Sequence, residues 1–232
     1  ENDRAVQLQL LKAGIITPLY LYHNGKFIYD QGRNAVVSPK IDGIHPKVID
    51  RRTSESIGKM LAGFHQAVKK IPHARQAWLN PDFVEKPTAH EDDPLTKKAR
   101  EFINESRAIY DTSMPRGIIH GDIHGSNLMV DPQEPSKVTA VFDFEEAEEN
   151  ILIVDIARTV LAITAVDDGR KLDTELIESF VKGYSSIRLL TEEERKNLPK
   201  AIKYAAGACM LWYVKNGMPD RARNAISRIE TL

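Results

Sequence analysis

The sequence lacks most features that would assign the chain to an extracellular, membrane or nucleic-acid-binding setting. Cys209 is the single cysteine among 232 residues, which excludes an internal disulfide and favours a reducing cytoplasm. No apolar run approaches the ~20 residues of a membrane span, and residues 1–16 mix charge with leucine, unlike a signal peptide. Because the 32 basic and 33 acidic residues are dispersed, we expect no nucleic-acid or membrane partner. The oligomeric state is left open.

The pattern of apolar residues predicts an α+β chain in which a small antiparallel sheet precedes a mainly helical part. The pair Asn24-Gly25 separates two strand-like segments, 19–23 and 26–29, and suits a type I′ hairpin turn. Residues 35–38 form a further predicted strand, and residues 39–43 a connector. Apolar residues then recur at helical spacing. The predicted helices span residues 3–13, 54–70, 94–113, 151–166, 173–184, 199–215 and 219–230.

The most informative segments are His-Gly-Asp-Ile-His-Gly-Ser-Asn at residues 120–127 and Asp-Phe-Glu at residues 143–145. Between them, residues 128–130 and 138–142 are rich in apolar and β-branched side chains, which is typical of two strands joined by a turn. We therefore predict an antiparallel hairpin that returns the second segment to the first.

The register of this hairpin is expected to bring two oxygen ligands together. If Met129 pairs with Val141, Asn127 lies opposite Asp143, about 5 Å away. Mg²⁺ prefers oxygen ligands and usually binds through one or two carboxylates together with substrate phosphates. A separate carboxylate, that of Asp122, can accept the proton of an attacking hydroxyl. We interpret Asn127 and Asp143 as metal ligands and Asp122 as the catalytic base or orienting residue.

These segments resemble the catalytic elements of the aminoglycoside phosphotransferase and choline kinase group, which has a protein-kinase-like fold. Residues 56–65 and 155–157 support the resemblance, and residues 183–195 look most like the bacterial homoserine kinases of this group. The resemblance implies an ATP- and Mg-dependent transfer of a γ-phosphate to a hydroxyl of a small molecule, which is homoserine-like, choline-like or an aminoglycoside. It also implies a partial N-terminal nucleotide lobe over residues 1–43 and a helical C-terminal lobe over residues 44–232.

The resemblance assigns further residues around the catalytic loop (residues 120–127). Backbone groups of Pro39 and Ile41 are expected to contact adenine, although an ordinary loop explains this stretch equally well. His120 is expected to support the loop by packing and hydrogen bonding. Asp155 lies in an apolar run and is expected to brace the loop backbone, because a buried carboxylate needs donors. A helix N-cap is the alternative role for Asp155.

Other residues near the two segments are possible substrate contacts. His124 is either loop filler or a substrate contact, with filler favoured. Glu145 and Glu146 begin an acidic stretch, continued by Glu148 and Glu149, that either attracts a cationic acceptor or forms a solvated turn. Trp212 and Tyr213 could line an acceptor pocket or a quaternary-ammonium cage, but the apolar helix around them favours packing in the core.

The chain lacks the phosphate-binding elements that the resemblance implies. No Gly-x-Gly and no Gly-Lys-Ser/Thr occurs, and the lysines before residue 40, Lys12 and Lys26, are in the wrong contexts. We therefore expect that the first strands of the N-terminal lobe are absent from this chain. A non-catalytic binding or regulatory relative is the alternative function, and it leaves open whether the 232-residue piece is active alone.

A third interpretation comes from Gly-Asp-Ile-His-Gly at residues 121–125, which matches the first metal motif of the calcineurin-like phosphatases. Those enzymes build a two-metal centre that needs further Gly-Asp and Asn-His motifs downstream. No histidine follows His124, so too few ligands remain for such a centre. A metallophosphatase is the weakest of the three alternatives.

Overall fold

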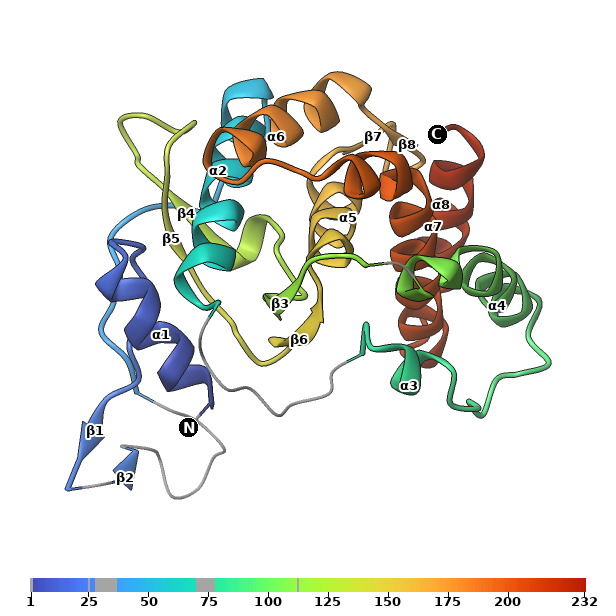
Figure 1. Cartoon of the computed structure of the whole chain (residues 1–232), viewed down its shortest axis with the longest axis horizontal. Coiled ribbons are helices and arrows are strands. Elements are labelled where there is room, and N and C mark those ends of the chain that lie inside the picture. Colours follow the sequence, from blue (N-terminus) through green and yellow to red (C-terminus); the bar gives the residue numbers. More distant parts are fainter. Residues whose placement is uncertain (1, 25, 28–36, 70–77, 112) are drawn as a thin grey trace.

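The computed structural model describes all residues except 1, 25, 28–36, 70–77 and 112. The N-terminal part, at the lower left of Figure 1, holds the helix α1 (Asn2–Lys12) and the antiparallel pair β1 (Tyr22–His23) and β2 (Lys26–Phe27). This confirms the predicted first helix and hairpin, and Asn24 has the positive φ of 50° that a tight hairpin turn requires.

Two predictions in this part cannot be followed along their whole length. Residues 28–29 of the second predicted strand and residues 35–36 of the predicted strand 35–38 lie outside the described residues. Residues 37–38 are described and are not part of a strand. The division into lobes after residue 43 stays a prediction.

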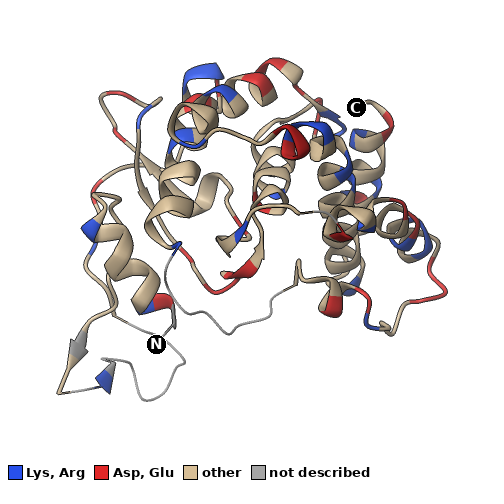
Figure 2. Ribbon diagram, in the orientation of Figure 1, with Lys and Arg blue, Asp and Glu red and all other residues tan. Residues whose placement is uncertain are grey.

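The remainder of the molecule is mainly helical, as the sequence predicted. The acidic and basic residues are interspersed along its helices (Figure 2), in agreement with the dispersed charge of the sequence. None of the helices in the described part of the chain is both long and apolar enough to cross a membrane. The helices are α2 (Arg51–Ala67), α3 (Pro81–Val84), α4 (Pro94–Ser106), α5 (Leu152–Ile163), α6 (Thr174–Ile187), α7 (Glu192–Lys215) and α8 (Pro219–Glu230), with 3₁₀ turns η1 (Arg107–Asp111) and η2 (Gly125–Asn127).

The start of α7 differs most from the prediction, since this helix begins at Glu192 and not at residue 199. Thr191 accepts a hydrogen bond from the backbone of Glu194, whose side chain accepts one from the backbone of Thr191 in return. This capping box satisfies two backbone N–H groups at the helix start. Pro199 lies inside this helix, although a proline usually favours a boundary.

Helices α2 and α6 cross with their backbones in direct contact. A Cβ atom on Gly183 would lie 2.0 Å from the backbone oxygen of Glu55, and one on Gly58 would lie 2.2 Å from that of Phe180. Only glycine fits at these two positions. The close crossing brings His65 of α2 within 2.7 Å of the hydroxyl of Tyr184 on α6.

Short antiparallel pairs connect the helical part to the motif segments. β3 (Arg116–Ile119) pairs with β6 (Glu148–Ile151), and β4 (Leu128–Val130) pairs with β5 (Val138–Val141). A smaller pair, β7 (Ala165–Val166) and β8 (Lys171–Leu172), follows α5. The β3–β6 pair and α5 lie in the middle of the molecule in Figure 1, between α2 and α7. The catalytic loop therefore leaves β3 from within the hydrophobic core.

Candidate active site

The catalytic loop is attached to α5 through Asp155, which is fully buried. The carboxylate accepts hydrogen bonds from the backbone N–H of His120 at 2.7 Å, the backbone N–H of Gly121 at 2.9 Å and Nε2 of His65 at 2.9 Å. Burial raises the pKa of Asp155, but the hydrogen bond and charge of His65 lower it further, so that the net pKa lies below its ordinary value. The alternative role as a helix N-cap is wrong, because the N-cap of α5 is Ile151.

The imidazole of His120 links two parts of the site. Its Nδ1 accepts from the backbone N–H of Asp122 at 3.3 Å, and its Nε2 donates to the carbonyl of Phe142 at 2.8 Å. The ring lies against Phe64 and Phe144, with centroids 5.7 and 5.2 Å away. Burial lowers the pKa of His120, which keeps the ring neutral with its proton on Nε2. His120 therefore connects the catalytic loop to the chain that follows β5.

Asp122 is half-buried and surrounded by hydrogen-bond donors. Its carboxylate forms an ion pair with Arg158 and lies 3.3 Å from Nε2 of His124. Because Nδ1 of His124 accepts from the backbone of Ser126, the proton of this ring is on Nε2 and is directed at Asp122. Burial raises the pKa of Asp122, but His124 and Arg158 together lower it below its ordinary value. Asn127 donates from Nδ2 to the backbone oxygen of Asp122 at 2.9 Å.

The predicted hairpin between the two motif segments is present, but its register differs by one residue. Met129 pairs with Ala140, and an irregularity follows it in β4. Asn127 accepts from the backbone N–H of Phe142 at 2.9 Å, so it lies opposite Phe142 and not opposite Asp143. The predicted Met129–Val141 pairing is therefore wrong, although the two predicted metal ligands still lie on adjacent stretches of backbone.

Asp143 lies just after β5 and has an unusual backbone conformation. Asp143 has a φ of 63°, in the left-handed region, which redirects the chain directly after β5. Its side chain is exposed and, among the described residues, accepts only a weak hydrogen bond, 3.5 Å long, from the backbone of Glu145. The negative charges of Asp122 and Asp143 both act on the imidazole of His120, which indicates that the three groups are neighbours.

The predicted adenine contacts lie next to the hairpin. Pro39 is exposed and Ile41 is half-buried, in a segment without helix or strand. The segment ends at Ile44, which exchanges two backbone hydrogen bonds with Val130 of β4, 3.1 and 2.8 Å long. Pro39 and Ile41 therefore lie just before Ile44, whose backbone pairs with the edge of the β4–β5 hairpin. The predicted metal ligands flank the strands of this hairpin.

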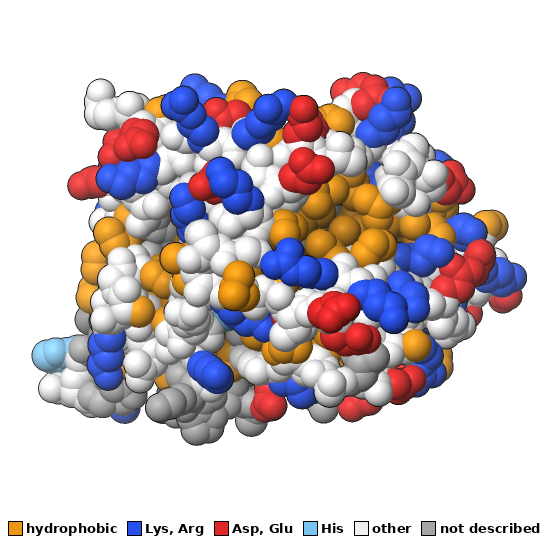
Figure 3. Space-filling view, turned by 45° about the horizontal axis from the view of Figure 1, so that its top comes forward, with side chains coloured by type: hydrophobic (Ala, Val, Ile, Leu, Met, Phe, Trp, Pro, Cys, Tyr) orange, Lys and Arg blue, Asp and Glu red, His pale blue; other side chains and the backbone are white. Residues whose placement is uncertain are grey.

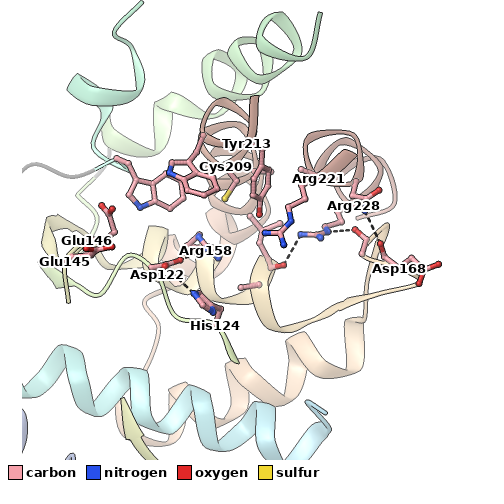
Figure 4. A pocket seen from close by; sticks show the side chains of 18 residues that line it. Asp122, His124, Glu145, Glu146, Arg158, Asp168, Cys209, Tyr213, Arg221 and Arg228 are labelled. Carbon is pink, nitrogen blue, oxygen red and sulfur yellow. Dashed lines mark hydrogen bonds and ion pairs between the residues drawn. The ribbon is translucent and has the colours of Figure 1, made fainter. Parts of the chain in front are cut away.

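A cavity of about 540 Å³ opens beside Asp122 (Figure 4). Its wall includes His124, Glu145 and Glu146, the three residues that the sequence suggested as substrate contacts. The cavity volume is in the range of small-molecule sites. The acidic turn predicted after Asp143 is wrong for Glu148, which lies in β6 and is fully buried.

The C-terminal helices form the other wall of the cavity. Trp212 is 44% exposed, and it lines the cavity together with Tyr213 and Cys209 on α7. The prediction that Trp212 packs in the core is therefore wrong. In the space-filling view of Figure 3, hydrophobic side chains collect in a broad hollow that is bordered by charged ones.

Comparison with known proteins identifies the family. Residues 5–196 match the model of the phosphotransferase enzyme family known as APH. The chain belongs to this family. The match includes the catalytic loop and the Asp-Phe-Glu segment and ends within α7.

Curated relatives of this APH-family chain include homoserine kinases. That of Polaromonas naphthalenivorans is 29% identical over 196 residues, and that of Granulibacter bethesdensis 24% identical over 182 residues. These alignments cover 78% and 75% of this chain. The chain spans only 58% and 56% of the length of the two kinases.

Solved structures with the same fold include two further kinases. An aminopropanol kinase associated with a microcompartment has a TM-score of 0.69 at 18% identity, and the match covers 96% of this chain and 78% of that one. An amicoumacin kinase, solved with AMP-PNP, Ca²⁺ and its ligand, has a TM-score of 0.68 at 17% identity, covering 97% and 76%. These matches confirm the protein-kinase-like fold and the predicted family, and they leave the metallophosphatase interpretation without support.

The donors present in this APH-family chain fit a metal that is bound together with a nucleotide. Among the described residues, no group of three or more His, Cys, Asp or Glu side chains could hold a metal ion. Asn127 and Asp143 offer two side-chain oxygens, and Asp143 is exposed. Two oxygen ligands suit Mg²⁺ whose other positions are filled by phosphate and water.

The sequence analysis missed four residues of the cavity wall. Arg158 follows Asp155 by one helical turn, and an arginine within an apolar run was a signal that it has a buried partner. Trp78, over whose ring the Arg158 guanidinium lies at 5.6 Å, carried no such signal. Arg221 and Arg228 are in α8, where basic residues at helical spacing are typical of a solvated face.

Proposed function

We propose that this chain carries the catalytic part of an ATP- and Mg²⁺-dependent kinase that phosphorylates a hydroxyl of a small amino alcohol. The main support is the position of Asp122. Its carboxylate is kept ionised by His124 and Arg158, it faces a metabolite-sized cavity, and its loop is held by a buried aspartate. A carboxylate in this state can orient an acceptor hydroxyl and take its proton.

The other predicted residues take complementary roles in this proposal. Asn127 and Asp143 hold Mg²⁺, which neutralises charge on the phosphates when it is bound. Backbone groups of Pro39 and Ile41 meet adenine. His120, which hydrogen-bonds to the chain on both sides, keeps the base and the metal ligands at a fixed separation.

The proposed acceptor class draws on the relatives. Both curated relatives are named homoserine kinases, and one structural match is named an aminopropanol kinase. All three names describe a small molecule that carries an amine and a hydroxyl. A choline-like or aminoglycoside acceptor is less well supported, because the charges in the cavity are of both signs.

One observation favours a second candidate function. The chain has no Gly-x-Gly sequence and no lysine in the expected strand context to hold the phosphates of ATP. A non-catalytic relative that binds the same small molecules would have this property. ATP consumption by the chain with a panel of amino alcohols, aminoglycosides and sugars separates the two functions, since retained ligand binding without turnover favours the non-catalytic one.

Substitution of Asp122 tests the proposed function directly. Asp122→Asn removes the proton acceptor and keeps the shape of the side chain, so we expect kcat to fall by about 10²- to 10⁴-fold. The midpoint of thermal unfolding should change little. Asp92→Asn, at a fully exposed aspartate, is the matched control. Unchanged turnover by Asp122→Asn would contradict the assigned role.

Substitution of Asp143 tests the metal site. Asp143→Ala should weaken Mg²⁺-dependent nucleotide binding about tenfold or more, because it removes the one charged ligand. Calorimetric titration with a nucleotide, with and without Mg²⁺, measures the effect. Asp131→Ala, in the turn of the same hairpin, should bind as the wild type does. Undiminished binding by Asp143→Ala would rule out the ligand assignment.

A further inference from the structure

One end of the cavity beside Asp122 carries an excess of positive charge. Arg221 and Arg228, both on α8, line the cavity near each other in Figure 4. Among the described residues neither arginine forms an ion pair with a carboxylate, whereas Arg158 in the same wall is paired with Asp122. The two α8 arginines therefore bring charge to the cavity that the described protein does not neutralise through an ion pair.

Arg228 is fixed in place by the backbone. Its Nε donates to the carbonyl of Gly169, and its Nη1 donates to the carbonyl of Leu161 at 3.1 Å. A guanidinium has five N–H donors, so these bonds leave donors for a ligand. The pKa of Arg228 is lowered, first by burial and also by the charges of Arg158 and Arg221. A bound anion would relieve this repulsion, because it would interact favourably with all three guanidinium groups.

Arg221 is exposed and lies over the ring of Tyr213, 6.0 Å from its centroid. One aspartate, Asp168, is also at this end of the cavity (Figure 4), and its backbone carbonyl accepts from Asn224. Two arginines against one exposed aspartate leave a net positive charge. A planar carboxylate matches the geometry of arginine N–H groups.

The opposite end of the cavity has the opposite character. Glu145 and Glu146 lie there in Figure 4, and the rings of Trp78 and Trp212 also line the cavity. Acidic side chains and indole faces are suitable surroundings for an ammonium group. Asp122 lies between the two ends in Figure 4. A ligand with separate positive and negative groups would thus present its middle to the proposed base.

We infer that the acceptor is a hydroxy amino acid whose carboxylate is bound by Arg221 and Arg228 of α8. The inference rests on the proposed function for the role of Asp122, and it selects among the acceptors of that proposal. Choline-like compounds and aminoglycosides lack a carboxylate and would leave both arginines without an anionic partner. The α8 helix lies beyond residue 196, where the match to the family model ends, so that match by itself does not assign these arginines.

Binding of three matched ligands to the 232-residue chain tests the inference without relying on catalysis. L-homoserine carries a carboxylate, an amine and a hydroxyl. The aminopropanol used is 3-amino-1-propanol, which matches homoserine without the carboxylate. α-Aminobutyrate matches homoserine without the hydroxyl. We expect calorimetry to give an affinity for homoserine about 10- to 100-fold higher than for aminopropanol, the range for a charge-assisted hydrogen-bonded group. α-Aminobutyrate should bind nearly as well as homoserine.

Variants of α8 assign the effect to residues. Arg221→Ala should reduce the preference for homoserine about tenfold and leave the affinity for aminopropanol unchanged. Arg228→Lys, which keeps the charge but loses the fork of donors, should weaken homoserine binding to a smaller extent. Arg223→Ala is the matched control, because this exposed arginine of the same helix pairs with Asp220 and does not line the cavity. Thermal unfolding of each variant verifies folding.

The outcomes separate the inference from the proposed function. Equal affinity for homoserine and aminopropanol, no binding of either, or a preference that survives Arg221→Ala would overturn the inference. ATP consumption with aminopropanol at the homoserine rate would also overturn it and leave the kinase proposal standing. Homoserine binding that depends on Arg221, without ATP consumption, would support the inference and contradict the kinase proposal.

Discussion

The catalytic loop and the cavity wall formed by α7 and α8 differ in how their functional side chains are held. Asp155 and His120 are fully buried, and each makes hydrogen bonds to backbone groups of the loop or the hairpin. Arg221 and Trp212 are exposed at the cavity wall, and neither side chain forms a hydrogen bond within the described part of the chain. The loop is therefore fixed by the fold, while the exposed wall residues Arg221 and Trp212 can change with little effect on folding. Arg228 differs from them, because it is hydrogen-bonded to the backbone carbonyls of Gly169 and Leu161.

This difference suggests a division between chemistry and recognition. Groups that must be placed accurately, such as the proposed base, need rigid support from neighbouring backbone. Groups that distinguish one acceptor from another are more free to vary on an exposed helix, where substitutions usually change stability by less than about 0.5 kcal/mol. Substitutions in the loop support should therefore reduce stability and activity together, whereas those in the wall should change affinity alone.

The largest effect is expected for Asp155. Asp155→Ala leaves three donors without an acceptor, on His120, Gly121 and His65, and should lower the free energy of unfolding by about 3–5 kcal/mol. Denaturant unfolding measures this change. Asp155→Asn, which keeps one acceptor oxygen, should lose less. A change below about 1 kcal/mol for Asp155→Ala, comparable to that of the exposed control Asp220→Ala, would show that the loop is not supported in this way.

A smaller effect is expected when the free energy of unfolding is measured as a function of pH. The pKa of His120 is lowered by burial, so the unfolded chain binds a proton near pH 6.5 that the folded protein does not. The free energy of unfolding should therefore fall as the pH drops below about 6.5, by at most about 1.4 kcal/mol per pH unit for this proton. Asp155, whose pKa is also lowered, adds a further loss as the pH falls below the ordinary range of an aspartate.

Unfolding curves at about pH 7.5 and about pH 5 measure the effect. His120→Gln should make the unfolding free energy less dependent on pH, whereas His90→Gln, at an exposed histidine, should leave the dependence unchanged. An equal pH dependence in the wild type and His120→Gln would contradict the assignment of the effect to His120.

The smallest effect is expected for Arg158, which forms an ion pair with Asp122 of the catalytic loop and also lines the cavity. Arg158→Met removes the charge that helps to lower the pKa of Asp122, so the acid limb of the kcat/KM profile should move to higher pH. At neutral pH Asp122 stays ionised. Because a partly exposed ion pair contributes up to about 1 kcal/mol, activity there should change by about fivefold or less. An acid limb at the wild-type position would show that the ion pair has no influence on the base.

The sequence predicted the loop better than the wall, and the reason is physical. A carboxylate in an apolar run, as at Asp155, must find donors, so its hydrogen bonding could be inferred, whereas the brace itself was implied by the resemblance to the kinase group. The one-residue shift in the hairpin could not be inferred, because it depends on an irregularity after Met129 and on the left-handed backbone of Asp143. Glu148 was misjudged because its burial is set by its pairing in β6.

The wall residues were missed for another reason. Arg221 and Arg228 have the spacing of ordinary charged residues on a surface helix, and only the packing of α8 beside α7 turns them toward a cavity. Trp212 was assigned to the core because its neighbours in sequence are apolar, but the end of α7 is partly exposed. Recognition surfaces of this kind depend on contacts between distant segments, which local patterns do not encode.

The close crossing of α2 and α6 at Gly58 and Gly183 has a consequence far from either glycine. The two helices that meet there carry His65 and Tyr184, and this pair orients the buried acid beneath the catalytic loop. A methyl group on either glycine would push the helices apart and move the carboxylate of Asp155 away from the backbone N–H groups of His120 and Gly121, to which it is hydrogen-bonded. The smallest side chains in the protein therefore set the alignment of its reactive centre.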